Sequence, residues 1–388
     1  MSDRAARALD ARLRARLTDW ENAGLLRTLA PPAGIDLSSN DYLQLSSHPD
    51  VVSRFAEAVR QAGAGSTGSR LLRGEREAFA RVERRFAALK QTERSLFFSS
   101  GYLANLAVLT TLPEVGDVLF SDARNHASLI DGSRLSRATT VVFPHNDVAA
   151  LARALRSSDA VLPFVVVESL FSMDGDMAPL VDYAEVCAAR GAALIVDEAH
   201  AVGIYGERGS GLIEATGIEA MVTASINTAG KALGVAGAFV AGSASVISYM
   251  TQRARPFVFS TAPPPALADA LEASLDLVGA EPERRLRVQR LSSYLRARLA
   301  AHGVDVLPGS SQILSVIVGD NDRAMGVATA LQGAGFDVRA IRPPSVPECT
   351  ARLRVSVNAG VAEATLDQFA GLLATTLREV GVTCAVSS

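Results

Sequence analysis

Lysine is rare in this chain, and one of its two lysines lies where an amine could do chemistry. Of the 38 basic residues in the 388-residue sequence, only Lys90 and Lys231 are lysines. Unlike arginine, lysine can lose its proton and act as an amine nucleophile. Lys231 lies in the small, apolar run 229–234 (AGKALG), which makes a solvated surface lysine the weaker alternative. Burial there would lower the pKa of the amine toward nucleophilic competence.

An acidic residue that ends an apolar run is the natural partner for this lysine. Asp197 follows residues 193–196 (ALIV), and His200 stands shortly after it. Taken alone, an Asp-x-x-His segment is equally well explained as a helix cap and a core histidine. With a lysine beyond the next strand, the pattern suits pyridoxal 5′-phosphate (PLP), because the aspartate can hold the pyridine nitrogen protonated and the lysine can form a Schiff base.

The sequence also offers a site for the phosphate of this cofactor. Residues 99–105 (SSGYLAN) follow the apolar run 96–98 and open a helical stretch. The backbone N–H groups of Gly101 and Tyr102 would then face an anion at the positive end of the helix. A strand–glycine–helix turn is a weak signal alone, but three compatible features in chain order indicate a PLP site.

From residue 95 onward, short apolar runs alternate with helical stretches. Continuous apolar strands separated by helices predict an α/β fold with a mostly parallel sheet covered on both faces. Ligands bind beyond the carboxyl ends of the strands in such sheets, which is where Asp197 stands. The expected strands are 96–98, 118–120, 141–143, 164–167, 193–196, 221–222 and 238–240.

We expect three parts along the chain. Residues 1–50 form an N-terminal helix, over about 5–29, and an irregular segment. Residues 51–285 form the large PLP-binding domain, and residues 286–388 form a smaller α+β C-terminal domain. The elements expected in the smaller domain are strands at 313–318 and 352–357 and helices at 323–333 and 362–380. One face of the N-terminal helix is apolar: Leu9, Leu13, Leu17 and Trp20.

Composition and charge exclude several classes of protein. The 38 Lys and Arg residues against 41 Asp and Glu give a net charge of −3, which argues against a dedicated nucleic-acid or membrane-surface binder. No apolar run is long enough for a signal sequence or a membrane span. Three widely spaced cysteines, Cys187, Cys349 and Cys384, fit neither a disulfide framework nor a zinc site. We expect a cytoplasmic protein with no metal centre, nucleic-acid partner or membrane partner.

Several segments together resemble a known family over nearly the whole chain. They are residues 38–43 (SSNDYL), 65–70 (GSTGSR), 125–128 (NHAS), 171–176 (FSMDGD), 197–200 (DEAH) and the loop of Lys231. These segments are similar to those of the α-oxoamine synthases, which are PLP-dependent transferases of fold type I. The resemblance implies a mostly parallel central sheet in the large domain and homodimers with shared active sites.

The resemblance also implies roles for individual residues. Lys231 would carry the Schiff base, Asp197 would hold the pyridine nitrogen, and His200 would lie near the phenolic oxygen of the cofactor. His126 would stack on the ring, although an Asn-His loop that caps a helix is the simpler alternative. Further cofactor contacts would come from Gly101, Tyr102, Ser172 and Thr228 and, across the dimer interface, from Ser260 and Thr261.

The substrate residues implied by the resemblance are Arg27, Asn40, Thr350 and Arg354. Arg352 and Arg354 alternate along one strand and so share a face, and the family pattern favours Arg354 for the carboxylate of an amino acid. Arg27 is equally well explained as a solvated arginine at a helix end.

Within the family, three segments are most similar to the members that condense L-alanine with a pimeloyl thioester and release CO2. They are residues 125–132 (NHASLIDG), 144–147 (PHND) and 340–347 (AIRPPSVP). The thioester could be on coenzyme A or on acyl carrier protein. The alternatives are a sister synthase that uses glycine or serine with another acyl-CoA, an aminotransferase, and a non-catalytic partner subunit, against which Lys231 counts. Four departures from the common family pattern leave fine specificity open: Gln44, Ala201, Val202 and Ala229.

Overall fold

A seven-stranded sheet forms the centre of the large domain. The computed structural model describes residues 2–381, and the strand order of this sheet is β2-β8-β7-β6-β5-β3-β4. β8 runs antiparallel to both of its neighbours, and the remaining pairs are parallel. The strands are β2 (Arg94–Phe98), β3 (Val118–Asp122), β4 (Thr139–Phe143), β5 (Pro163–Glu168), β6 (Ala193–Asp197), β7 (Ala224–Thr228) and β8 (Ala238–Gly242).

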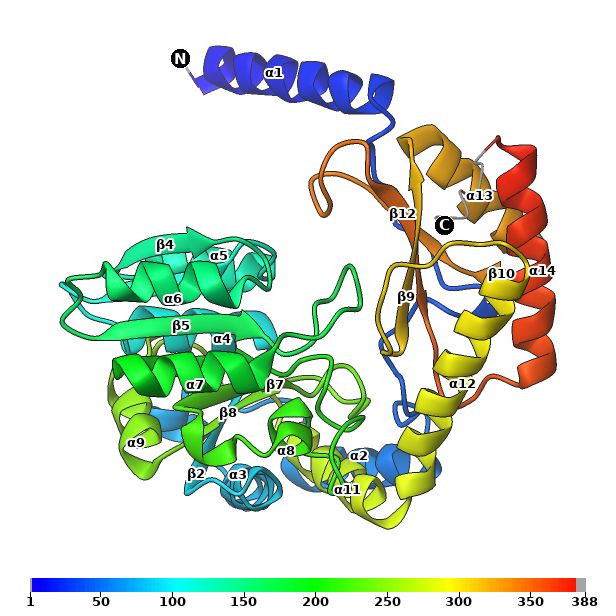
Figure 1. Cartoon of the computed structure of the whole chain (residues 1–388). Coiled ribbons are helices and arrows are strands. Elements are labelled where there is room, and N and C mark those ends of the chain that lie inside the picture. Colours follow the sequence, from blue (N-terminus) through cyan, green and yellow to red (C-terminus); the bar gives the residue numbers. More distant parts are fainter. Residues whose placement is uncertain (1, 382–388) are drawn as a thin grey trace.

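Helices cover both faces of this sheet because its strands are apolar on both faces (Figure 1). In β5, Phe164 and Val166 join one core, whereas Val165 and Val167 join the other. The first core includes residues of α4 (Gly101–Thr111), α5 (Ala127–Leu135), α9 (Ala244–Arg253) and α10 (Arg255–Val258). The second includes residues of α2 (Pro49–Ala62), α3 (Glu77–Lys90), α6 (Val148–Arg156), α7 (Leu180–Arg190), α8 (Leu212–Thr216) and α11 (Ala266–Ala280).

One expected strand of this sheet is wrong. Residues 221–222 do not form a strand, because a short 3₁₀ turn, η2 (Glu219–Met221), ends there. The strand is β7, whose sequence ASINT has no continuous apolar run. Two of its buried polar side chains bond to each other, since Asn227 Nδ2 donates to Ser225 Oγ at 3.0 Å. An apolar pattern could not predict this arrangement.

The N-terminal helix α1 (Ser2–Asn22) is shorter than the 5–29 expected, because a left-handed glycine ends it. Gly24 has φ +62°, and its N–H donates to Glu21 O at 3.0 Å. The N–H of Leu25 reaches back to Trp20 O at 2.7 Å. This pair of bonds is a Schellman motif, which satisfies the last carbonyls of a helix.

The smaller domain is built on a second, antiparallel sheet with the order β11-β12-β9. Its strands are β9 (Ile313–Gly319), β11 (Arg339–Ile341) and β12 (Ala351–Ser356). Its helices are α12 (Pro282–Ala301), α13 (Asn321–Gly333) and α14 (Glu363–Glu379). The N-terminal segment contributes β1 (Ile35–Asp36), which pairs in parallel with β10 (Phe336–Asp337). Residues 285 and 286 lie near the start of α12, and we propose this helix as the link between the two domains.

The helix α1 stands off the body of the molecule (Figure 1). Its apolar face is 46% to 52% exposed at Leu9, Leu13, Leu17 and Trp20. Within residues 2–381, every helix is too short or too polar to cross a lipid bilayer. Cys187 is buried and Cys349 is exposed, both as free thiols, and Cys384 lies outside the described residues.

A buried ion pair ties the segment that follows β6 to α3. Lys90, in the last turn of α3, donates to Glu198 Oε2 and, at 2.7 Å, to Ser210 O. Both side chains of the pair are at most 2% exposed. Glu198 directly follows Asp197 and also accepts from the N–H of Ile213 at 2.9 Å. Lys90 therefore fixes the backbone beyond β6 and is not available as an amine.

Replacing Lys90 by methionine should destabilise the protein strongly. Lys90→Met leaves the carboxylate of Glu198 buried without its counter-charge, at an expected cost of about 3–5 kcal/mol in the free energy of unfolding. Urea unfolding followed by circular dichroism measures this loss. The control is Arg14→Met, which removes an exposed pair with Asp10 on α1 and should cost less than about 1 kcal/mol. Equal losses in the two variants would contradict a structural role for the buried pair.

Candidate active site

A cavity of about 170 Å³ lies where three neighbouring parallel strands end. The last residues of β5, β6 and β7 line it, as does the first residue of α4. The carboxyl edge of the sheet is therefore the site, as expected for an α/β sheet. The lining residues are Gly101, Tyr102, Asn105, His126, Ser128, Glu168, Asp197, Ala199, His200, Thr228 and Lys231.

Asp197 is held by donors on both of its carboxylate oxygens. Asn105 Nδ2 donates to Oδ2 at 2.7 Å, and the N–H of Ala199 donates to Oδ1 at 2.8 Å. Asn105 lies one helical turn after Gly101 in α4, so the start of this helix and the end of β6 are locked together. The carboxylate is 5% exposed and has one fixed orientation toward the cavity.

Lys231 lies beside His200 in the interior of the site. Lys231 Nζ and His200 Nε2 are 2.7 Å apart. Burial lowers the pKa of Lys231 to about 8, although the nearby Asp197 and Glu168 carboxyls oppose this change. Burial and the adjacent lysine also hold the pKa of His200 well below its usual value. The site thus contains a neutral imidazole and an amine whose neutral fraction is far larger near neutral pH than that of an ordinary lysine.

A chain of hydrogen bonds connects Lys231 to the smaller domain. His200 Nδ1 lies 2.7 Å from the hydroxyl of Tyr42, which donates to Asn40 Oδ1 at 3.0 Å. Arg354 Nη2 donates to the same Asn40 oxygen at 3.0 Å. Because the Tyr42 hydroxyl donates its hydrogen to Asn40, its oxygen can only accept from His200 Nδ1–H. The other ring nitrogen of this neutral histidine, Nε2, therefore accepts from Lys231. The lysine and the arginine are therefore oriented by one continuous network.

Arg354 is buried without a carboxylate partner. Its guanidinium is 7% exposed and donates to Ser172 O at 2.6 Å and to Ser356 Oγ at 3.0 Å. None of the carboxylates in the described part of the chain forms an ion pair with it. Arg352, by contrast, pairs with Asp174. A buried guanidinium with only neutral acceptors is suited to bind an anion that enters the site.

His126 both caps a helix and lines the cavity. It is the N-cap residue of α5, where its Nδ1 accepts from the N–H of Ser128 at 3.2 Å and lies 2.7 Å from Ser128 Oγ. Burial lowers the pKa of His126. His126 therefore caps α5 and lines the cavity at the same time, so the two alternatives that the sequence left open for it are compatible.

Three site residues were missed by the sequence reasoning: Tyr42, Asn105 and Glu168. Glu168 ends β5 beside Asp197 at the end of β6, with these two residues in register. Burial and the Asp197 carboxylate raise the pKa of Glu168 well above its usual value. The signal that could have found Glu168 is its position after an apolar strand, which is the same signal that identified Asp197.

Several expected site residues, Asn40 and Arg354 among them, do not line this cavity. Ser172 is near it, and its carbonyl accepts from Arg354. Arg27 Nη2 lies 3.4 Å from Ser345 Oγ, and Thr350 Oγ1 donates to Pro347 O at 2.7 Å. Ser260 and Thr261 follow α10 and do not line the cavity. Their roles stay predictions.

The residues around the cavity fit PLP. A Cβ atom at Gly101 would stand 2.3 Å from Thr228 Oγ1, so only glycine lets the start of α4 approach β7 this closely. That approach brings the N–H groups of a helix N-terminus to the rim of the site, where they can bind a phosphate. Asn105 Oδ1 and Glu168 Oε1 are buried without hydrogen-bond partners, which indicates room for a polar ligand.

Comparisons with known proteins identify the family. The sequence profile of the family Aminotransferase class I and II matches residues 32–373. The 8-amino-7-oxononanoate synthase of Paraburkholderia xenovorans (strain LB400) is 46% identical over 345 residues, which cover 87% of this chain and 88% of that protein. The 8-amino-7-oxononanoate synthase of Bordetella petrii is 44% identical over 384 residues, or 96% of each chain.

Solved structures agree with this result. Serine palmitoyltransferase from S. paucimobilis, solved with PLP and myriocin bound, has a TM-score of 0.89 at 30% identity and covers 96% of this chain and 98% of its own. The 8-amino-7-oxononanoate synthase of Francisella tularensis has a TM-score of 0.77 at 26% identity and covers 89% of this chain and 98% of its own.

The fold and the site define a PLP-dependent transferase of fold type I, which confirms the predicted fold class. The chain belongs to the aminotransferase class I and II family and, within it, to the α-oxoamine synthases. The family resemblance seen in the sequence is therefore confirmed, and PLP is the cofactor of this enzyme.

Covalent capture of PLP by the apoprotein should speed up with pH. Only the neutral amine attacks the cofactor aldehyde, and the pKa of Lys231 is lowered to about 8. The capture rate should rise about tenfold per pH unit well below that pKa and level off above it, as measured by stopped-flow absorbance. Borohydride reduction should then label Lys231. A label on Lys90, or a rate that ignores pH, would contradict the assignment, and Lys231→Ala is the control.

Proposed function

We propose that this enzyme catalyses the decarboxylative condensation of L-alanine with a pimeloyl thioester. The products are 8-amino-7-oxononanoate, CO2 and the free thiol, as a step of biotin biosynthesis. The observation that carries this proposal is the buried Arg354 guanidinium, which has no carboxylate partner and is linked to Lys231 by hydrogen bonds. The names of the relatives support the choice of substrates.

Four residues of this chain have separate roles in the proposed reaction. PLP, when bound, makes the Cα proton of the amino acid acidic by withdrawing electrons from that carbon. Arg354 binds the amino-acid carboxylate and fixes the direction of the Cα–H bond. Lys231, with a pKa of about 8, takes the Cα proton and later returns one. Asp197 presents its fixed carboxylate to the pyridine nitrogen, and His126 covers the cavity.

A pair of arginines supports a site for the far end of the acyl chain. Arg27 and Arg342 lie close enough that the charge of Arg27, together with burial, lowers the pKa of Arg342. Neither of them forms an ion pair with a carboxylate among residues 2–381. Arg342 instead donates to Gly24 O and, at 3.3 Å, to Leu26 O. The Asp322 carboxylate acts on Arg342 in the opposite direction but forms no ion pair with it. Two neighbouring guanidinium groups without an ion-paired carboxylate suit the terminal carboxyl of a pimeloyl chain or the phosphates of the donor.

We propose a homodimer with shared active sites. Ser260 and Thr261 lie outside the cavity of their own chain, so a phosphate contact from them requires a second copy. Two large apolar side chains are exposed. Phe259, which precedes Ser260 in the sequence, is 72% exposed, and Leu72, in η1 (Arg70–Gly74), is 85% exposed. Burial of such side chains against a second copy is a common basis for stable dimers. The cytoplasmic location stays a prediction.

Arg354→Lys should raise the KM for alanine by roughly tenfold to a hundredfold, because a charge-assisted bidentate pair is worth about 1.5–3 kcal/mol. The KM for the thioester should change little. The matched control is Arg339→Lys on the neighbouring strand β11, whose side chain pairs with Asp337 and should affect alanine less. Steady-state kinetics with each substrate varied in turn measures both values. Equal effects on the two substrates would make Arg354 structural.

A panel of acyl donors tests the choice of reaction. Pimeloyl-CoA or pimeloyl-acyl carrier protein should be preferred clearly over acetyl-CoA, succinyl-CoA and palmitoyl-CoA. Arg27→Ala should weaken use of the pimeloyl donor and leave the alanine-induced change in cofactor absorbance intact. A preference for another acyl chain would make the protein a sister synthase. Conversion of the cofactor to its amine form by alanine alone would make it an aminotransferase.

A further inference from the structure

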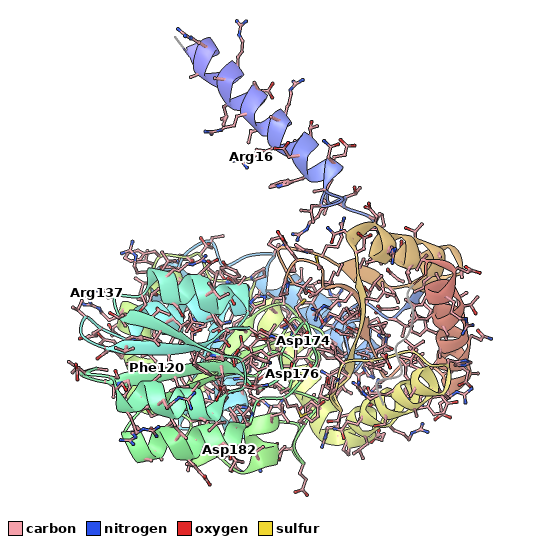
Figure 2. The ribbon with its side chains drawn as sticks, turned by 45° about the horizontal axis from the view of Figure 1, so that its top comes forward. Arg16, Phe120, Arg137, Asp174, Asp176 and Asp182 are labelled. Atoms are coloured by element: carbon pink, nitrogen blue, oxygen red, sulfur yellow. The ribbon has the colours of Figure 1, made fainter. Side chains whose placement is uncertain are left out.

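A short hairpin joins the two domains next to the active site. It comprises residues 170–177, with a bridge between Leu170 and Met177 at its base. The N–H of Phe171 donates to Asp176 O at 2.9 Å, and the N–H of Gly175 donates to Phe171 O at 3.0 Å. Figure 2 shows Asp174 and Asp176 between the large domain and the smaller one. The hairpin follows β5 directly, so its base belongs to the large domain.

The tip of this hairpin is held by the sheet of the smaller domain. Ser315 Oγ, in β9, donates to Met173 O at 2.5 Å, and Ser311 Oγ donates to Gly175 O at 2.6 Å. Arg354 Nε, in β12, donates to Ser172 O at 2.6 Å. The hairpin therefore supplies one of the acceptors that position the Arg354 guanidinium, beside those from Asn40 and Ser356.

His145 clamps the base of the hairpin to the central sheet. Its Nδ1 lies 2.8 Å from Asp122 Oδ1, at the end of β3, and its Nε2 lies 2.7 Å from Asp176 Oδ2. The ring also packs edge-on against Phe171, with centroids 4.4 Å apart. Only a protonated imidazole donates from both nitrogens. A neutral His145 would lose one of these bonds and leave two carboxylates close together.

The surroundings of this contact are acidic. The titratable and charged side chains around it are Asp122, Arg124, Asp147, Asp174, Asp176, Asp182, Tyr183 and Arg352, which also pairs with Asp174. Arg124 pairs with Asp174. Burial and the same carboxylates raise the pKa of Tyr183, so this phenol stays neutral. Burial disfavours the charged form of His145, but hydrogen bonds to Asp122 and Asp176 outweigh it and raise the pKa of His145 to about 9.

We propose that protonated His145 is a positioning residue for the condensation: it holds the hairpin at residues 170–177 against the sheet, and the hairpin holds Arg354. His145 touches neither the cavity nor the reacting atoms, so it acts through the hairpin. This inference rests on the proposed function, because Arg354 matters here as the group that binds alanine. It gives residues 144–147 a physical role that the family resemblance left open.

The sign of the pH effect follows from the direction of the pKa change. The pKa of His145 is raised in the folded protein, so its contribution is present below about pH 9 and is lost as the pH rises through that value. Alanine binding should therefore weaken by roughly tenfold above that pH, the value of one charged hydrogen bond. Asp176→Asn removes one of the two carboxylates, so the weakening should begin at a lower pH.

The experiment measures alanine binding to the holoenzyme without any thioester. The dissociation constant comes from the alanine-induced change in cofactor absorbance between about pH 6.5 and pH 10. The proteins compared are the wild type, Asp176→Asn, His145→Gln and, as the control, His302→Gln, which replaces an exposed histidine of the smaller domain. The ring-proton signal of His145, assigned by its loss in His145→Gln, reports the pKa directly by nuclear magnetic resonance.

We expect three results from these proteins. Because the amine of alanine also titrates in this range, affinities are compared at each pH with that of His145→Gln. Relative to that variant, the wild type and His302→Gln should lose affinity for alanine along the titration of His145. Asp176→Asn should shift both the titration and the loss of affinity to lower pH. His145→Gln should bind alanine more weakly at neutral pH while it retains PLP, because Lys231 and Asp197 do not depend on the hairpin.

Two outcomes would overturn the proposal, and they differ in scope. If the His145 signal shifts in Asp176→Asn while alanine affinity keeps its wild-type pH dependence, the inference fails and the proposed function stands. If alanine produces no absorbance change in the wild-type holoenzyme at any pH, the proposed function fails, and this inference fails with it.

Discussion

The burial of the Arg354 guanidinium without a counter-charge is the constraint around which the site is organised. A buried charge is costly unless its donors find acceptors, and here the acceptors are neutral oxygens of Asn40, Ser172 and Ser356. Ser356 lies on the same strand as Arg354, whereas Asn40 and Ser172 lie far away in the chain. The burial of this one cation therefore depends on two distant segments being brought to the same place.

The same constraint explains why the two domains must dock accurately. Arg354 belongs to the smaller domain, whereas Asp197 and Lys231 belong to the edge of the large sheet. Tyr42 and His200 bridge the gap with hydrogen bonds, and the hairpin at residues 170–177 bridges it with backbone carbonyls. Hydrogen bonds form only within a narrow range of distances, so a small shift between the domains would break the connection between Lys231 and Arg354.

The sequence predicted the parts of the site that depend on local pattern. Asp197 ends an apolar strand, and Gly101 opens a helix after another, so a parallel sheet brings both to one edge. Two of the features that sequence reasoning missed depend instead on hydrogen bonds between polar side chains. Tyr42 matters through its bond to His200, and β7 escaped notice because its buried Ser225 and Asn227 pair with each other. Such pairs leave no periodic signal in a single sequence.

The two lysines of the chain show why arginine could not replace them. Lys231 needs to lose its proton near neutral pH, and the guanidinium of arginine stays charged in proteins. Lys90 keeps a compact ammonium between Glu198 and the carbonyl of Ser210, in a space where its side chain is 2% exposed. The planar fork of arginine is larger and presents its donors in a fixed geometry. Both lysines contact the turn that begins at Asp197: Lys90 bonds to Glu198, and Lys231 lies beside His200. A sequence that otherwise uses arginine therefore has lysine at the two positions where this turn limits the size and the charge of the basic side chain.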